Sequence, residues 1–148
     1  MNETNEQLHN KIEDLERGLL IEKMISQTLF EIIMLEYSSL SIKDILDEIK
    51  INKVAIYGMG RIGKALYEMF IRNQISVIYC VDMNKNIELE TTEIIHDIKK
   101  MTNNVDAVII TPEIHFESIK KNIESIVDCP IIMARELIEN ILLLPQPI

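Results

Sequence analysis

Apolar residues in the first 50 positions recur at helical spacing. Steps of four, three and four residues separate the members of a seam formed by Leu8, Ile12, Leu15 and Leu19. This spacing is typical of a coiled coil about two heptads long. Between residues 20 and 35 apolar side chains occupy several faces, so this stretch must pack on the rest of the chain or on another copy. Gly18 is expected to kink or weaken the helix, because glycine is unfavourable in a helix interior.

A capping pattern at Ser41 and Asp44 predicts a short second helix before residue 50. We therefore predict that residues 1–50 form a helical arm. The arm is expected to assemble the protein into a dimer or tetramer that buries the apolar surface from Leu20 to Leu35.

From residue 51 onward, short apolar runs alternate with amphipathic segments. The apolar runs predict strands over 54–58, 76–81, 107–110 and 131–133, and the amphipathic segments predict helices over 61–73, 113–127 and 135–143. Residues 83–104 are expected to form a loop or short strand together with a helix near 93–101. Apolar strands separated by helices are typical of a parallel sheet covered on both faces. The prediction is an α/β fold: a small doubly wound, Rossmann-like domain over residues 51–148, preceded by the helical, coiled-coil arm.

The first of these strands runs into a glycine pattern, Gly58-Met59-Gly60-Arg61-Ile62-Gly63. In a dinucleotide-binding unit the first glycine turns the chain, the second lets the backbone approach a pyrophosphate, and the third packs the helix on the sheet. The N–H groups at the helix start then face the phosphates. Asp82 follows the next strand, about 20 residues further on, where a carboxylate binds the adenosine ribose.

This spacing predicts a nucleotide site. NAD is favoured over NADP, because the carboxylate of Asp82 would repel a 2′-phosphate. S-adenosylmethionine and coenzyme A stay open as alternatives, since each can use a glycine turn and a ribose-binding acid.

A second group of candidates follows the strand at 107–110, at the sheet edge where open α/β sheets bind ligands. Thr111 and Pro112 are placed beside the ligand, and His115 is a candidate acid or base with Glu113 as its partner. No metal site is predicted, because Cys80 and Cys129 lack ligand spacing and fit buried reduced thiols. The predicted cofactor-binding set is Gly58, Met59, Gly60, Arg61, Ile62, Gly63, Asp82, Thr111 and Pro112.

Charge and composition restrict the partners. The formal net charge is −9 over 148 residues, which argues against non-specific binding to nucleic acid or anionic membranes. The polar, acidic N-terminus lacks the apolar run of a signal peptide. The apolar stretch at 19–35 carries charges and is shorter than the ~20 residues of a membrane span. We expect a cytoplasmic protein without membrane insertion, and a protein partner stays open.

The segment Lys53–Asp82 resembles the NAD(P)-binding Rossmann superfamily. Residues 56–67 look like small uncharacterised bacterial proteins of polysaccharide or glycosyltransferase contexts, and residues 106–112 and 129–132 agree with that pattern. Residues 105–112 are also similar to the Gfo/Idh/MocA oxidoreductases, but Ile132-Met133-Ala134-Arg135 stands where their catalytic Glu-Lys-Pro motif is expected. The turn at 58–63 looks like the nucleotide-binding domains that regulate potassium transport.

Three functions are compatible with these patterns. The leading hypothesis is a module that binds a nucleotide, NAD(H), and regulates or assembles without a complete catalytic site, because little chain remains for a substrate domain. The second is a small NAD-dependent oxidoreductase or sugar-nucleotide enzyme whose site is completed at an oligomer interface, with His115 and Glu113 as acid and base. The third is an interaction protein whose Rossmann scaffold is empty.

Overall fold

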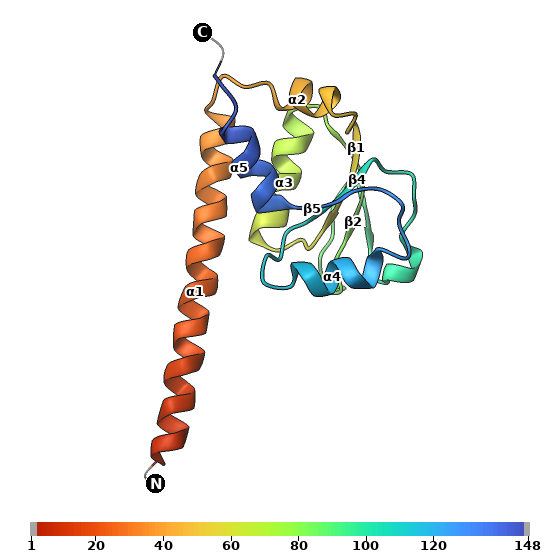
Figure 1. Cartoon of the computed structure of the whole chain (residues 1–148). Coiled ribbons are helices and arrows are strands. Elements are labelled where there is room, and N and C mark those ends of the chain that lie inside the picture. The colour runs from red at the N-terminus through yellow and green to blue at the C-terminus, as the bar shows by residue number, and fades with distance from the viewer. Residues whose placement is uncertain (1–2, 147–148) are drawn as a thin grey trace.

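A computed structural model of the chain describes residues 3–146. Within this range two helices come first, and five strands with three further α-helices follow from residue 53 onward (Figure 1). The elements are α1 (Asn5–Glu36), α2 (Ile42–Glu48), β1 (Lys53–Tyr57), α3 (Arg61–Arg72), β2 (Ser76–Val81), β3 (Glu93–Ile95), a 3-10 turn (Ile98–Lys100), β4 (Ala107–Ile110), α4 (Phe116–Ile123), β5 (Ile131–Met133) and α5 (Ala134–Leu142). The predicted α/β class is confirmed.

The five strands form one parallel sheet in the order β3-β2-β1-β4-β5. β1 lies in the middle, with β2 and β3 on one side and β4 and β5 on the other. Strand order therefore reverses between β1 and β4, and in open α/β sheets ligands bind at the carboxyl ends of the strands beside such a reversal. The predicted Rossmann-like fold is confirmed, and the glycine turn lies at this point because it directly follows β1.

Side chains along each strand alternate between the two faces of the sheet. Ile56 and Ile109 lie in a hydrophobic core that also contains residues of α1, α2, α3 and α5. Ala55, Val108 and Ile110 lie in a second core with residues of α4. Because both faces are covered, the strands read as near-continuous apolar runs in the sequence.

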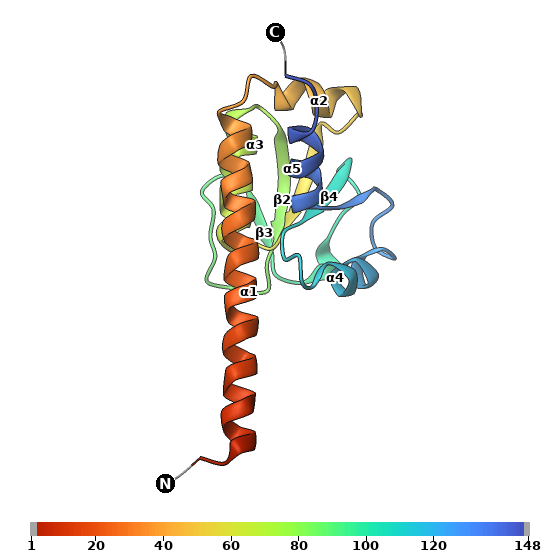
Figure 2. The same cartoon turned by 60° about the vertical axis from the view of Figure 1, so that its left-hand side comes forward.

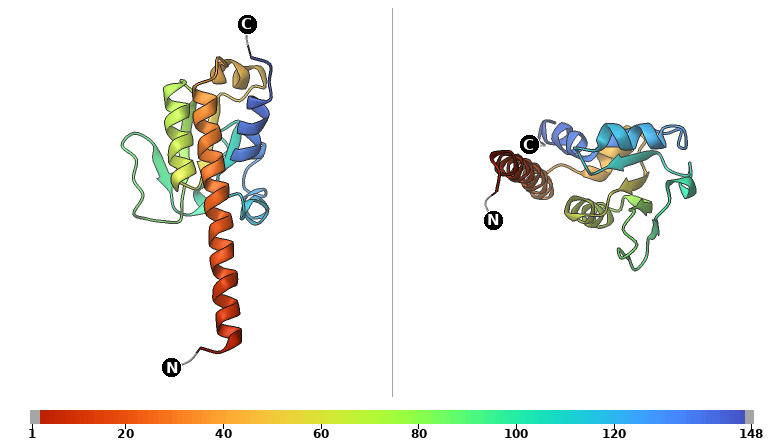
Figure 3. Two further views of the ribbon diagram at one scale, coloured as in Figure 1. Left: turned by 90° about the vertical axis from the view of Figure 1, so that its left-hand side faces the viewer. Right: turned by 90° about the horizontal axis from the view of Figure 1, so that it is seen from below.

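α1 contacts α3 and α5 with only part of its length. Figures 2 and 3 show its C-terminal half lying against these helices, whereas its N-terminal half extends beyond the α/β domain. Thr28, Ile32 and Leu35 are buried in this contact, and the last two share a hydrophobic core with Ile56. The apolar stretch at 20–35 thus packs on its own chain along one face. Long as it is, α1 is not apolar enough to cross a membrane, nor is any other helix among residues 3–146.

Three local predictions need correction. α1 continues straight through Gly18 (Figure 1), because one glycine costs only about 1 kcal/mol in a helix. The helix expected near 93–101 is wrong: its first residues form β3, and a single 3-10 turn follows, capped by the Asp97 side chain. Pairing with the edge of β2 outweighs the local helical pattern there. α4 is shorter than the predicted 113–127 at both ends, since bends and turns occupy residues 113–115 before it and turns occupy residues 124–126 after it.

Candidate functional site

The turn between β1 and α3 has glycine at two positions where the structure leaves no room for a side chain. Gly58 has a φ of +93°, and a Cβ there would lie 2.6 Å from Oγ1 of Thr111. A Cβ on Gly63 would lie 1.9 Å from the carbonyl oxygen of Gly58. Gly58 therefore lets the chain turn sharply out of β1, and Gly63 lets the first turn of α3 pack directly on that turn.

Gly60 lies in the same turn without such a constraint. Its φ of −73° and ψ of −156° are an extended conformation. Within the described part of the chain, nothing lies within 4 Å of the position that its Cβ would take. The residue is exposed and its open side faces the cavity described next. Packing within the chain therefore does not require glycine at position 60.

A cavity of about 260 Å³ opens at the carboxyl edge of the sheet, between the glycine turn, the loop from β4 to α4, and α1. Its lining consists of Gly58, Gly60, Arg61, Ile62, Asp82, the run Thr111–His115, and Ile21, Met24 and Ile25 of α1. All but two of the predicted cofactor-binding residues thus meet at one cavity, as do both catalytic candidates. The exceptions are Met59, whose side chain is buried in the core, and Gly63, which lies beneath the turn.

The wall that α1 contributes was not predicted from the sequence. Ile21 and Ile25 belong to the stretch at 20–35, whose apolar residues occupy several faces of the helix. In the sequence, these additional apolar residues are the signal that the helix packs against more than one neighbour. The local pattern does not say that this stretch returns to the glycine turn, more than 30 residues away in the chain. Most of the cavity surface is consequently apolar, with charged groups at its edge.

α1 also places a carboxylate beside the glycine turn. Nη1 and Nη2 of Arg61 donate to the two carboxylate oxygens of Glu22, at 2.9 and 2.7 Å. This hydrogen bonding and the opposite charge lower the pKa of Glu22 and raise the pKa of Arg61. Among the described residues no side chain caps the N-terminus of α3, where Arg61 begins the helix. Arg61 is thus at the helix end that faces the cavity, and a carboxylate holds its side chain.

Asp82 joins the end of β2 to the glycine turn. One carboxylate oxygen accepts a hydrogen bond from the Met59 N–H at 2.7 Å, and the other accepts one from the Asn84 N–H at 2.8 Å. His96 is half-buried, and its Nδ1 donates to the backbone carbonyl of Asp82 at 2.7 Å. A carboxylate oxygen can accept a second hydrogen bond, so Asp82 keeps the capacity to accept from a ribose hydroxyl.

Thr111 holds the glycine turn from the side of β4. Its buried hydroxyl donates to the carbonyl oxygen of Gly58 at 2.8 Å and lies 3.2 Å from that of Tyr57. Its N–H donates to the carbonyl oxygen of Tyr57 at 3.0 Å. The hydroxyl is therefore engaged by the backbone of the turn, and Pro112 continues the cavity lining beside it.

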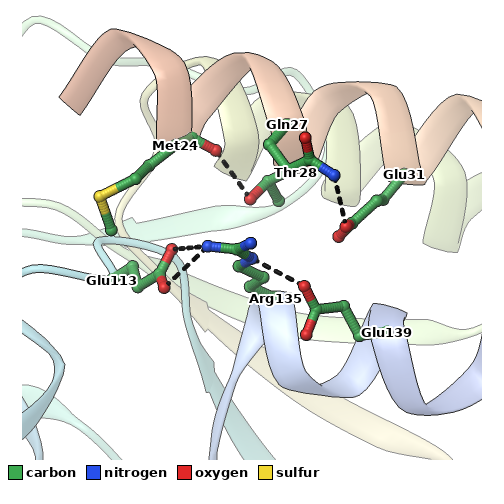
Figure 4. A network of polar contacts seen from close by, with 7 residues as sticks. All are labelled: Met24, Gln27, Thr28, Glu31, Glu113, Arg135 and Glu139. Atoms are coloured by element: carbon green, nitrogen blue, oxygen red, sulfur yellow. Dashed lines mark hydrogen bonds and ion pairs between the residues drawn. The ribbon is translucent and has the colours of Figure 1, made fainter. Parts of the chain in front are cut away.

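The carboxylate of Glu113 is paired with Arg135 of α5. Figure 4 shows the guanidinium of Arg135 between Glu113 and Glu139, below α1. Nη1 lies 3.1 and 3.3 Å from the carboxylate oxygens of Glu113, and Nε donates to Glu139 at 2.8 Å. These bonds raise the pKa of Arg135. His115 precedes α4, exposed at the cavity edge, so the structure pairs Glu113 with an arginine rather than with the histidine.

Thiol and metal chemistry have no support among the described residues. Burial raises the pKa of the Cys80 thiol to about 12 and also raises that of the half-buried Cys129. A thiol with a raised pKa is a poor nucleophile, because only the thiolate attacks. Within residues 3–146 no three His, Cys, Asp or Glu side chains are grouped as metal ligands.

Comparison with known proteins gives one family. The family described as C2185-like, N-terminal, matches residues 50–132, from the end of α2 to β5. The match includes the glycine turn, Asp82 and the loop from Thr111 to His115, and it excludes α1. No curated protein and no solved structure matches the chain. These comparisons do not assign the chain to an NAD(P)-binding superfamily.

Proposed function

The chain belongs to the C2185-like, N-terminal family, and we propose that it binds a nucleotide, NAD(H), in the cavity beside Gly60. The proposed role is that of a regulatory or assembly module without a complete catalytic site of its own. The ligand lies over the turn at residues 58–63, with its phosphates toward the start of α3.

The glycine at position 60 is the observation that carries the proposal. Gly58 and Gly63 are explained by the fold, because a Cβ at either would overlap neighbouring atoms. Gly60 has open space in front of it and lines the cavity. Close approach of a phosphate to the backbone is the physical reason for a glycine here, and the uncapped N-terminus of α3 offers N–H groups to an anion at the same place.

Asp82 supports a ribose-containing ligand and favours NAD over NADP. Its carboxylate lines the cavity next to the glycine turn and has remaining capacity to accept hydrogen bonds from ribose hydroxyls. The same negative charge would repel a 2′-phosphate. The cavity, at about 260 Å³, lies just below the ~300–1,000 Å³ of common ligand sites, so it encloses only part of a dinucleotide.

Regulation or assembly, rather than catalysis, is supported by the contacts of Glu113 and by α1. The carboxylate of Glu113 forms an ion pair with Arg135. It is therefore not free to act as the partner of His115 in acid–base catalysis. One side of α1 lines the cavity through Met24 and Ile25. The other side carries an exposed apolar surface. A ligand that contacts α1 therefore contacts the element through which the chain is proposed to self-associate.

Thermal unfolding of the purified protein with NAD+, NADH, NADP+, S-adenosylmethionine and coenzyme A tests this proposal. A ligand at about 100 times its Kd adds ~2.7 kcal/mol to the free energy of unfolding, which corresponds to several degrees at this chain length. We expect the largest shift with NAD+ or NADH, and we expect Gly60→Ala to abolish it.

Gly18→Ala is the matched control, because Gly18 is also exposed with open space around it but lies on α1 away from the cavity. The control should keep the full ligand-induced shift. A shift that persists in Gly60→Ala, or no shift of the natural protein with any of the five ligands, contradicts the proposal. Asp82→Ala is less informative, since it also removes the hydrogen bond to Met59.

A further inference from the structure

α1 has two apolar faces on opposite sides. The inner face packs on the α/β domain and buries Thr28, Ile32 and Leu35. The outer face consists of the seam from Leu8 to Leu19 together with Phe30, Ile33 and Tyr37, whose exposed fractions lie between 46% and 88%. At 100° per residue each set spans a sector of about 60°, and the two sectors are nearly opposite.

α1 is unbroken from Asn5 to Glu36, with Tyr37 as its C-cap, so the residues of the outer face belong to one helix. Glu22 and Ser26 interrupt the heptad seam after Leu19, but the eleven residues from Leu19 to Phe30 make about three helical turns. Phe30 therefore returns to the side of the helix on which Leu19 lies. The outer face thus has two apolar parts on one side of the helix, Leu8 to Leu19 and Phe30 to Tyr37, with Glu22 and Ser26 between them.

Among the described residues, the α/β domain does not cover the N-terminal half of α1. This half extends beyond the α/β domain (Figure 1), and Ile12, Leu15 and Leu19 are each more than half exposed. An isolated helix of this length is marginal in water. A second helix along the outer face would stabilise this half by covering its apolar residues.

We propose that the outer face of α1 pairs with the same face of a second copy, in a parallel, in-register two-stranded coil. A second copy supplies a helix with the same spacing, so that in register its apolar residues meet apolar ones from Leu8 to Leu19 and from Phe30 to Tyr37, and the polar positions at Glu22 and Ser26 also meet each other. The seam places Lys11 and Glu16 at the positions that flank it, five residues apart. In parallel chains these positions face each other, so Lys11 of each chain meets Glu16 of the other.

The position of the α/β domain permits this arrangement. The domain covers the inner face only, so two copies can pair along their outer faces with both domains on the outside, as a twofold-symmetric dimer requires. The inference specifies the assembly part of the proposed function and does not depend on nucleotide binding. It also differs from the surface expected from the sequence, because one side of the stretch at 20–35 is already covered by α3 and α5.

Light scattering on the full chain without nucleotide is the first test. We expect a mass twice that of the chain and a shift to monomer in Leu15→Glu, which places two carboxylates in the seam. Asn10→Glu is the matched control, because Asn10 is exposed on the same free segment but on the opposite side of the helix. It should stay dimeric. A monomeric or tetrameric natural protein, or dissociation by both variants, overturns the proposal.

Disulfide cross-linking under mild oxidation tests the orientation. Leu15→Cys should give a covalent dimer, because parallel in-register chains place the two Leu15 positions side by side. Asn10→Cys and the natural protein, with its buried Cys80 and half-buried Cys129, should give none. A dimer without cross-linking through position 15 overturns the parallel arrangement. A monomer that still gives a nucleotide-induced shift overturns this inference and leaves the proposed nucleotide site standing.

Discussion

Gly63 of α3 lies against the carbonyl oxygen of Gly58, with room for nothing beyond a hydrogen atom. A Cβ at position 63 would lie 1.9 Å from that oxygen and 2.9 Å from the carbonyl carbon. Both neighbours are backbone atoms, so neither can move aside as a flexible side chain would. This contact therefore sets the distance between the first turn of α3 and the end of β1.

Gly63→Ala should consequently lower the free energy of unfolding strongly, by about 3 kcal/mol or more, since overpacking against backbone forces the helix away from the sheet. Urea denaturation monitored by circular dichroism measures the loss. Gly60→Ala, three residues earlier, should leave stability unchanged or raise it by up to ~1 kcal/mol, because alanine fits an extended backbone and restricts the unfolded chain. Equal losses in the two variants would contradict the packing described for this turn.

Thr111→Val should lower the free energy of unfolding by about 1–3 kcal/mol. Valine keeps the shape of the side chain but removes the hydroxyl that donates to the Gly58 carbonyl at 2.8 Å, which leaves a buried acceptor unpaired. The same denaturation experiment measures the change. Thr91→Val serves as control because Thr91 is exposed, and it should change stability little.

Glu22→Gln should raise the affinity for a phosphate-bearing ligand a few-fold. The carboxylate of Glu22 holds both terminal nitrogens of Arg61, and its removal frees the guanidinium and lowers the negative charge beside the α3 N-terminus. Calorimetric titration with the ligand found by thermal unfolding measures the affinity. Glu36→Gln is the control, since Glu36 pairs with Arg72 away from the cavity; a similar gain there would exclude competition at Arg61.

Asp106→Asn should destabilise the protein at neutral pH but not in acid. The carboxylate of Asp106 accepts hydrogen bonds from the N–H groups of Asn52 and Lys53, at 2.8 and 3.0 Å, and these bonds lower its pKa in the folded state. Because the pKa is lower in the folded state, ionised Asp106 stabilises the fold at pH values above its unfolded pKa of about 3.9. This stabilisation is lost as the pH falls through the pKa of the folded state.

Unfolding free energies of the natural protein and the Asp106→Asn variant, measured across pH, check this sign. The two curves should be separated by a constant difference above about pH 5 and should converge as the pH drops below about 4. A difference that grows toward acid pH would contradict the direction of the pKa shift.

Local patterns predicted most of the fold because the relevant information is short-range. An apolar run such as 107–110 is long enough for one strand. Ser41 caps α2 by accepting a hydrogen bond from the Asp44 N–H, a contact that spans three residues. The prediction failed at 93–101, where three residues join the edge of β2. A strand that short is decided by its neighbour rather than by its own sequence.

The candidate site likewise combines features set by short-range patterns with features set by long-range contacts. The order of elements and the glycine turn follow from the sequence, since Gly58 and Gly63 are set by backbone geometry within one βα unit. Asp82 and Thr111 could also be placed at the same edge of the sheet, because parallel strands end together. The contacts of Ile21, Met24 and Ile25 with the cavity, and of Glu22 with Arg61, are visible in the folded chain alone. Those contacts join residues more than 30 positions apart, and they depend on which face of α1 packs against α3 and α5, which helical periodicity alone does not specify.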